Sequence, residues 1–177
     1  MSNVQTLERP RKKSKPAPKT AAKPRQELPP VMPHIVCAGA AEAIAFYKKA
    51  FGAVETMRVP GPTGKLMHAG IQIGRASIML VDEMPEHGVL SPTTLKGSPV
   101  TIHLYVDDVD AFVARAVKAG ASVRMPVADM FWGDRYGILV DPYGHSWSIA
   151  TQLREMTADE VLEAMKNDPG VCGTGKA

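Results

Sequence analysis

The 177-residue sequence contains only two cysteines, Cys37 and Cys172. Two cysteines are too few for a disulfide-stapled scaffold and are typical of a protein in a reducing compartment. Long apolar runs are also missing, so we expect no membrane-spanning helix and no membrane partner. The N-terminus lacks the continuous apolar core of a secretory signal. Together these absences predict a cytoplasmic protein.

Excess charge is scarce outside the N-terminus. Eight Lys or Arg and two Glu give residues 1–29 a net charge of +6, which leaves about −3 for residues 30–177 of a chain whose total is +3. A mildly acidic folded part argues against a nucleic-acid-binding domain. Residues 1–30 have too few apolar side chains to offset the entropy of ordering, so we predict a disordered basic tail. We interpret this tail as solvated, although its run from Arg9 to Lys15 leaves open a weak contact with an anionic partner such as nucleic acid.

The rest of the sequence contains the same order of elements twice. Apolar periodicity predicts strand, helix and three strands at 31–37, 40–51, 54–59, 65–73 and 76–82. After a long loop at 83–98, the order returns at 100–106, 109–119, 122–125, 135–140 and 146–151. We therefore predict an α+β fold of two βαβββ modules, 31–83 and 99–151, in one domain at 31–155. Residues 156–177 add a short amphipathic helix and a tail.

Local signals set the ends of several elements. Asp108 is suited to cap the helix at 109–119, and Gly52 and Gly120 are suited to end the two long helices. Pro126 is expected to end the strand at 122–125, because proline cannot donate to a strand ladder. Thr157 is expected to start the C-terminal helix.

One stretch of the second module is dense in chemical groups. Phe131-Trp132-Gly133-Asp134-Arg135-Tyr136-Gly137 precedes a strand, and Asp141-Pro142-Tyr143-Gly144 reads as a turn. With the following His145-Ser146-Trp147-Ser148, this pattern resembles the vicinal oxygen chelate superfamily, in the glyoxalase and bleomycin-resistance group, closest to its PhnB-like branch. The resemblance implies an eight-stranded open barrel around a cleft, a homodimer, and a divalent metal in the usual family member.

Alternation along the strands indicates which side chains face that cleft. Thr101, His103 and Tyr105 share one face of their strand, whereas Ile102, Leu104 and Val106 face the helices. His68 and Gln72 share a face of the strand at 65–73, and His34 stands nearly where His103 stands in the repeat. We predict ligand contacts from His34, His68, Gln72 and Tyr105, with His103 as the catalytic general base. For each histidine, a hydrogen bond on a wet surface is the alternative.

The loop before the last two strands adds Trp132 and Arg135 as ligand-binding candidates. Trp132 is the indole expected to contact a ligand, because alternation with its serine neighbours turns Trp147 toward the helices. Arg135 is suited to clamp a carboxylate or phosphonate, or else to pair with Asp134 or Asp141. Asp141 itself reads as a turn former, and Cys37 reads as a small buried apolar residue.

The family's usual metal site is expected to be absent. The resemblance places its ligand positions at Thr101, near Met32, in the strand at 76–82 and at Ser148. Met and Ser are poor ligands for a divalent ion, which needs about three nitrogen or anionic oxygen donors. We therefore predict no metal and no cofactor. A zinc site built from His34, His68 and His103 is the alternative.

The leading functional hypothesis is a protein that binds a small polar or aromatic organic molecule in the cleft. Whether it is also a metal-independent enzyme of lyase or isomerase type stays open. One alternative is a drug-sequestering resistance protein of the bleomycin-resistance type, without chemistry. Another is a metal-dependent glyoxalase- or dioxygenase-like enzyme that uses the histidine site. A third is an interaction module that uses the basic tail.

Overall fold

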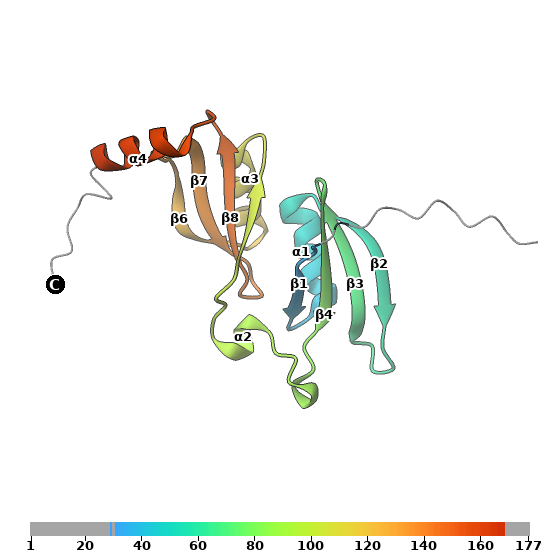
Figure 1. The fold of residues 1–177 in the computed structure, drawn as a ribbon. Helices are drawn as coiled ribbons and strands as arrows, with labels where there is room; N and C mark the ends of the chain where they lie inside the picture. Colours follow the sequence, from blue (N-terminus) through green and yellow to red (C-terminus); the bar gives the residue numbers. More distant parts are fainter. Residues whose placement is uncertain (1–28, 30, 169–177) are drawn as a thin grey trace, which may run out of the picture.

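The chain folds into two βαβββ modules joined by a linker (Figure 1). The computed structural model describes residue 29 and residues 31–168, so the predicted basic tail, apart from Pro29, lies outside the described residues. The first module comprises β1 (His34–Cys37), α1 (Ala40–Phe51), β2 (Val54–Pro60), β3 (Leu66–Ile73) and β4 (Ala76–Asp82). The second comprises β5 (Thr101–Tyr105), α3 (Val109–Ala119), β6 (Ser122–Asp129), β7 (Asp134–Val140) and β8 (Ser146–Gln152). A 3₁₀ turn (Pro85–His87) and α2 (Pro92–Leu95) lie in the linker, and α4 (Ala158–Asn167) follows β8.

Each module forms its own four-stranded mixed sheet, in the orders β1-β4-β3-β2 and β5-β8-β7-β6. In both sheets the first strand runs parallel to the fourth, and the register pairs His34 with Met79 and His103 with Ser148. His34 and His103 are therefore equivalent in the repeat. The predicted α+β fold of two βαβββ modules is confirmed, as an open pair of sheets and not a closed barrel.

The two long helices have the bounds that the sequence predicted, because their end signals act as expected. The Asp108 side chain accepts a hydrogen bond from the Ala111 backbone N–H at 2.9 Å, and Gly52 ends α1 with a φ of 67°. Thr157 and Glu160 form a reciprocal capping box at the start of α4. Each of these contacts satisfies backbone groups that a helix end leaves unpaired.

Strand β6 differs from the prediction, because it continues through Pro126 to Asp129. Its register against β7 is irregular between Met125 and Ala128, and β6 is an edge strand. A proline is tolerated at an edge or a bulge, where its missing N–H breaks no ladder. The strand predicted at 31–37 is also shorter and begins at His34. In the linker, the Ser91 side chain caps the short α2 helix, which the sequence had suggested to be loop.

Helices α1 and α3 lie between the two sheets and join the modules (Figure 1). The Phe51 ring stacks on Phe112 with centroids 5.1 Å apart and meets the Trp147 ring edge-on at 4.9 Å. Tyr47 and Trp147 are completely buried in the same core. One hydrophobic core therefore covers the helix-facing side of both sheets, and the opposite face of each sheet is left open.

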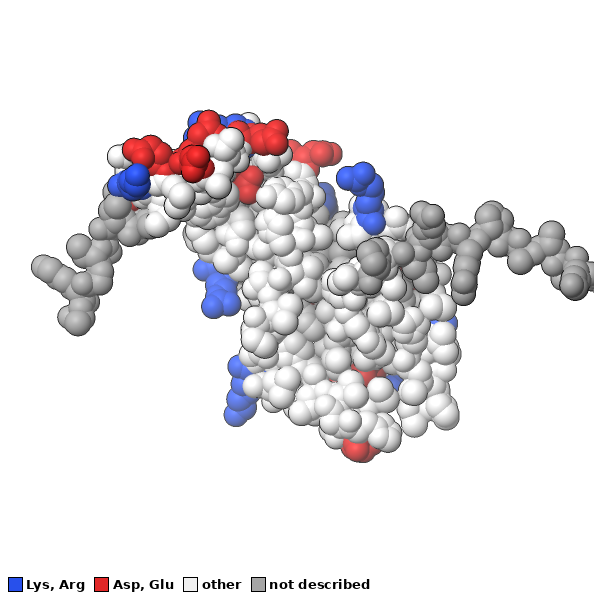
Figure 2. Space-filling view, viewed as in Figure 1, with Lys and Arg blue, Asp and Glu red and all other residues white. Residues whose placement is uncertain are grey.

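Charge is unevenly distributed over the surface. Figure 2 shows acidic side chains gathered at the end of the molecule that carries α4, and in this view few charged side chains lie over the strands. The acidic residues of α4 are Asp159, Glu160 and Glu163. Such an end repels nucleic-acid phosphates. No helix within the described residues is long and apolar enough to cross a bilayer.

Candidate functional site

Two neighbouring hollows contain most of the side chains predicted to bind a ligand. The first, which we call the His103 hollow, has a volume of about 550 Å³ and is lined among others by Phe51, Arg75, His103, Tyr105, Asp107 and Phe112. The second, the His68 hollow, has a volume of about 390 Å³ and is lined among others by Met32, Met57, His68, Gln72, Arg75 and Met79. Arg75 lines both hollows, so the two adjoin at the turn between β3 and β4.

His103 is held in place by the neighbouring strand. Its Nδ1 lies 2.7 Å from the Ser148 hydroxyl oxygen, across the β5–β8 register. The Tyr105 ring meets the imidazole edge-on at 4.6 Å, and the Tyr136 ring lies parallel to it at 6.1 Å. Within the described residues Nε2 has no hydrogen-bond partner. One nitrogen is therefore fixed by the protein, and the other is available to a ligand.

A buried carboxylate orders the aromatic side chains beside His103. Asp134 is 6% exposed and accepts hydrogen bonds from the Tyr105 hydroxyl at 3.2 Å and the Trp132 indole N–H at 3.1 Å. Desolvation and the Asp134 carboxylate raise the pKa of Tyr105, so its phenol stays protonated. The structure thus brings His103, Tyr105 and Trp132 together through Asp134 and Tyr136, which the sequence reasoning missed. The roles of these residues as ligand contacts remain predictions.

The turn before Asp134 requires glycine. Gly133 has a φ of 96°, and a Cβ there would lie 2.7 Å from the Arg154 carbonyl oxygen. That backbone conformation is disfavoured for other residues. The turn at Gly133 allows the indole N–H of Trp132 to donate to the carboxylate of Asp134, two residues later.

Arg75 is the cationic side chain of this region, and the sequence reasoning missed it. It lies in the tight turn between β3 and β4, next to Gly74, whose φ is 56°. The side chain is exposed and has no partner among the described residues. The sequence signal that could have identified Arg75 was its position in a two-residue hairpin turn. Such a turn needs no arginine for its own geometry, so a guanidinium there suggests another role.

The remaining predicted residues lie on the open face of the first sheet. The rings of His34 and His68 meet edge-on with centroids 6.3 Å apart. Gln72 donates from its side-chain amide to the Gly74 carbonyl oxygen at 3.1 Å. His68 and Gln72 line the His68 hollow, whereas His34 lines a third cavity beside β1. Their roles as ligand contacts remain predictions.

The residues of this chain do not fit the metal site of the resembling family. The fourth strands of the two modules present a hydroxyl at Ser148 and a thioether at the equivalent Met79, and neither suits a divalent ion. The alternative three-histidine site is not assembled within one chain, because His103 lines a different hollow from His68. Residue 29 and residues 31–168 contain no cluster of three His, Cys, Asp or Glu able to hold a metal.

Arg135 lies away from both hollows, on the opposite face of β7 from Asp134. It forms a bidentate ion pair with Asp110, at 2.6 and 2.8 Å, and a further one with Asp129 at 2.7 Å. The suggested partners Asp134 and Asp141 were wrong, since adjacent residues of a strand point to opposite faces. These pairs raise the pKa of Arg135 and lower that of Asp110.

Asp141 does more than form a turn. Oδ1 accepts from the Tyr143 and His145 backbone N–H groups, as a turn former does. Oδ2 accepts from the Tyr47 hydroxyl at 2.7 Å and the Trp147 indole N–H at 2.8 Å, and so joins the two modules. Trp147 and Cys37 are fully buried, as predicted.

Known proteins share this fold and sequence. The model of the Glyoxalase/Bleomycin resistance protein/Dioxygenase superfamily matches residues 28–149, and the chain belongs to this family. The resemblance carried by the loop and turn motifs is therefore confirmed. An uncharacterized protein of Mycobacterium tuberculosis is 50% identical over 142 residues, which cover 78% of this chain and 84% of that protein. The Arabidopsis thaliana protein At5g48480 is 32% identical over 124 residues, or 66% of this chain and 74% of that one.

Solved structures agree with this assignment. The X-ray structure of the Arabidopsis protein aligns with a TM-score of 0.57 at 27% identity, over 70% of this chain and 99% of that one. A PhnB protein from Bacillus cereus aligns with a TM-score of 0.54 at 16% identity, over 70% and 99%. The second likeness concerns the fold alone.

Proposed function

We propose that this protein binds a small planar organic acid in the His103 hollow, with the adjoining His68 hollow accommodating any larger substituent. One observation carries the proposal: an imidazole, a guanidinium and three aromatic rings line a single hollow of about 550 Å³. The Tyr105 ring, which is exposed, suits the face of an unsaturated molecule, and the almost fully buried Phe51 and Phe112 make the wall beside it apolar.

Arg75 supplies the preference for an acid. A guanidinium binds a carboxylate or phosphonate with two parallel hydrogen bonds, and Arg75 has no competing partner among the described residues. Asp107 lines the same hollow. The acidic group of the ligand is therefore expected on the Arg75 side, with the apolar part toward the rings.

His103 supplies the proton chemistry, if chemistry occurs. When Nδ1–H donates to Ser148, Nε2 is a free acceptor and can serve as a general base. When the Ser148 hydroxyl donates instead, Nε2–H can donate to the ligand. The first state suits an isomerase or lyase without a metal, and the second suits a protein that only holds its ligand.

A binding screen tests the proposal. Aromatic carboxylates and phosphonates, with neutral analogues of the same shape, are screened by thermal shift, and hits are measured by calorimetry. We expect the acids to bind more tightly, and Arg75→Gln to weaken them about tenfold, the effect of losing one charged hydrogen-bond partner. The matched control is Arg124→Gln, an exposed arginine on β6 that lines neither hollow.

The outcomes are distinguishable. Equal losses in Arg75→Gln and Arg124→Gln would contradict the site, since general charge would then explain the binding. Enzyme and sequestering protein are separated by incubating excess hit with the protein and looking for product. Turnover that His103→Gln abolishes supports an enzyme, whereas unchanged ligand bound at one per site supports sequestration, the resistance-type alternative.

We also propose a homodimer, as is common in this family. Support comes from a group of exposed apolar side chains on β2 and β3, where Val54, Met57, Val59 and Met67 are 44 to 63% exposed. A second copy is the occupant that would cover it. Sedimentation at micromolar concentration should show a dimer that Met57→Asp weakens, and a compact monomer would reject this proposal.

A further inference from the structure

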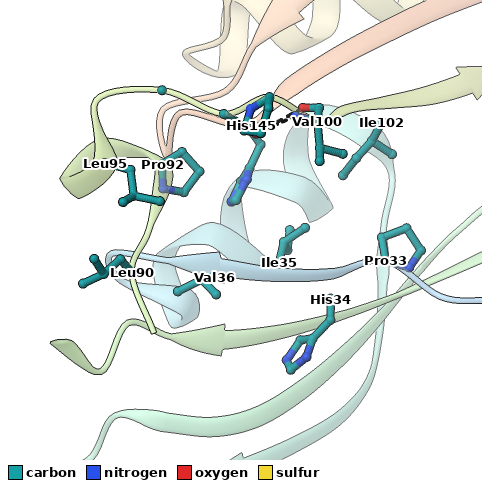
Figure 3. A pocket seen from close by; sticks show the side chains of 13 residues that line it. Pro33, His34, Ile35, Val36, Leu90, Pro92, Leu95, Val100, Ile102 and His145 are labelled. Atoms are coloured by element: carbon teal, nitrogen blue, oxygen red, sulfur yellow. Dashed lines mark hydrogen bonds between the residues drawn. The ribbon is translucent and has the colours of Figure 1, made fainter. Parts of the chain in front are cut away.

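A third cavity lies between the linker and the two modules. This linker cavity has a volume of about 270 Å³. Its walls come from β1, the linker and the start of β5, through Ile35, Val36, Leu90, Leu95, Val100 and Ile102 (Figure 3). No lining residue is shared with the His103 or the His68 hollow, so the cavity is a separate site.

His145 is the buried polar side chain of this cavity. His34, which is exposed, and Ser98, whose hydroxyl donates to the Val100 carbonyl oxygen, also line it. Figure 3 shows it between the linker residues Pro92 and Leu95 and the β1 residues Ile35 and Val36. The side chain is 6% exposed, and its Nε2 lies 3.7 Å from the Cys37 sulfur. The turn that carries it is fixed, because the His145 backbone N–H donates to Asp141 Oδ1 at 2.9 Å.

The second ring nitrogen of His145 faces open space. Within the described residues Nδ1 has no hydrogen-bond partner. No side-chain nitrogen or oxygen of these residues is both fully buried and unpartnered. Nδ1 must therefore reach a space that a ligand or solvent can fill, and the linker cavity is the space that His145 lines.

The chemistry of the walls selects a neutral ligand. No lining residue is Asp, Glu, Lys or Arg. Desolvation lowers the pKa of His145, so the imidazole is neutral at neutral pH. A neutral imidazole offers one donor or one acceptor and no charge. An ionised ligand would lose part of its hydration there without gaining an opposite charge, which is unfavourable.

The volume sets the size of the ligand. An apolar cavity of roughly 150 Å³ holds a benzene molecule. The linker cavity is larger and therefore has room for a bicyclic ring system. Val100 and Leu95 are 63% and 59% exposed, so the cavity has a side that opens to solvent.

We propose that the linker cavity binds a neutral, mainly apolar molecule of bicyclic size whose single hydroxyl or carbonyl group hydrogen-bonds to His145. This site is independent of the planar-acid site proposed above, because it takes uncharged ligands whereas that site takes acids.

Three probes of nearly one shape test the inference on the full chain. Naphthol carries one hydroxyl, naphthalene none, and naphthoate a negative charge. We expect naphthol to bind with a sub-millimolar dissociation constant in calorimetry, naphthalene more weakly, and naphthoate not in this cavity. His145→Phe, which keeps a ring and removes both nitrogens, should weaken naphthol about tenfold, as expected for one hydrogen bond to a buried group.

A second variant keeps the test valid if His145→Phe does not fold. Val100→Trp fills the open side from an exposed position and should abolish naphthol binding. Its control is Val123→Trp, at a 46% exposed position on β6 that does not line the cavity. Undetectable naphthol binding, binding unchanged by Val100→Trp, or binding lost in His103→Ala would overturn the inference. The last outcome would place the probe in the His103 hollow.

Discussion

The two modules have the same strand order, but the side chains on their open faces are held in place to different degrees. His103 and His34 are equivalent, yet His103 is hydrogen-bonded to Ser148, whereas His34 stands beside the thioether of Met79. The second face is further held by the Asp134 carboxylate, and the first is lined by Met32, Met57 and Met79. Hydrogen-bonded groups lose less entropy on binding, while methionines adapt to different shapes. Selectivity is therefore expected from the second module and tolerance from the first.

The largest effect is expected from a substitution that disrupts the hydrogen bonds of Asp141 between the two modules. Asp141→Asn replaces one carboxylate oxygen by an N–H₂ group that faces the Tyr47 hydroxyl and the Trp147 N–H. Breaking such a buried charged network costs about 3–5 kcal/mol of unfolding free energy. Urea unfolding measures the loss. Asp110→Asn, in an exposed ion pair, is the control and should cost less than about 1 kcal/mol.

If Asp141→Asn cost no more than its control, the Asp141 network would not be what holds the modules together. The shared apolar core and the Arg115 hydrogen bond to the Ala50 carbonyl oxygen would then carry the contact between them.

The second effect concerns the ordered face. Asp134→Ala frees Tyr105 and Trp132 from their shared acceptor, so the affinity for the best planar acid should fall about tenfold. Gln72→Ala, on the face without such a network, should change the same affinity about twofold or less. Calorimetry at one pH compares the two variants. Equal losses would remove the distinction between an ordered and an adaptable face.

The third effect separates a buried histidine from an exposed one. Desolvation, partly opposed by Asp141, depresses the folded-state pKa of His145 below its ordinary 6.5. Below pH 6.5 the unfolded chain binds a proton at this histidine that the folded chain does not bind. The contribution of His145 to the free energy of unfolding is therefore complete above pH 6.5 and is lost as the pH falls toward the folded-state pKa. The slope is at most about 1.4 kcal/mol per pH unit.

Urea unfolding at about pH 7 and about pH 5.5 measures this slope. His145→Gln should reduce the difference in unfolding free energy between the two pH values, and His103→Gln is the control on the open face. A variant that retains the full wild-type difference would show that other groups cause it.

The smallest effect is expected for Arg135, which shares β7 with Asp134 but faces α3. Arg135→Gln should leave planar-acid affinity within about twofold, because Asp110 and Asp129 already occupy its guanidinium. Stability should fall by less than about 1 kcal/mol, as for other exposed ion pairs. A tenfold loss of affinity in calorimetry would return Arg135 to the ligand-binding residues that the sequence suggested.

Much of the fold could be predicted from the sequence, because local signals act locally. The bounds of α1, α3 and β4 follow from periodicity and from caps such as Asp108 and Gly52. Strand β6 was predicted too short, because proline is excluded from central strands but tolerated at an edge, and sequence periodicity does not say which strand is an edge.

The site was less predictable, because hollows depend on tertiary packing. Alternation placed His103 and Tyr105 on one face correctly, but it could not show that the Arg75 turn of the other module reaches them. It also gave no reason to single out Asp134 or His145. Asp134 matters because it is buried beside hydrogen-bond donors from other segments, and His145 matters because distant segments form a cavity beside it.

Two of the four edge strands, β2 and β6, have a consequence for the behaviour of the chain at high concentration. Each contains a proline, Pro60 or Pro126, and each has an irregular register against its neighbour. An exposed strand edge is a template on which identical molecules can pair and grow into fibrils. A proline removes one donor from that template, and an irregularity bends it. The folded protein is therefore expected to resist edge-to-edge aggregation, and replacing Pro126 by a strand-forming residue would remove that protection.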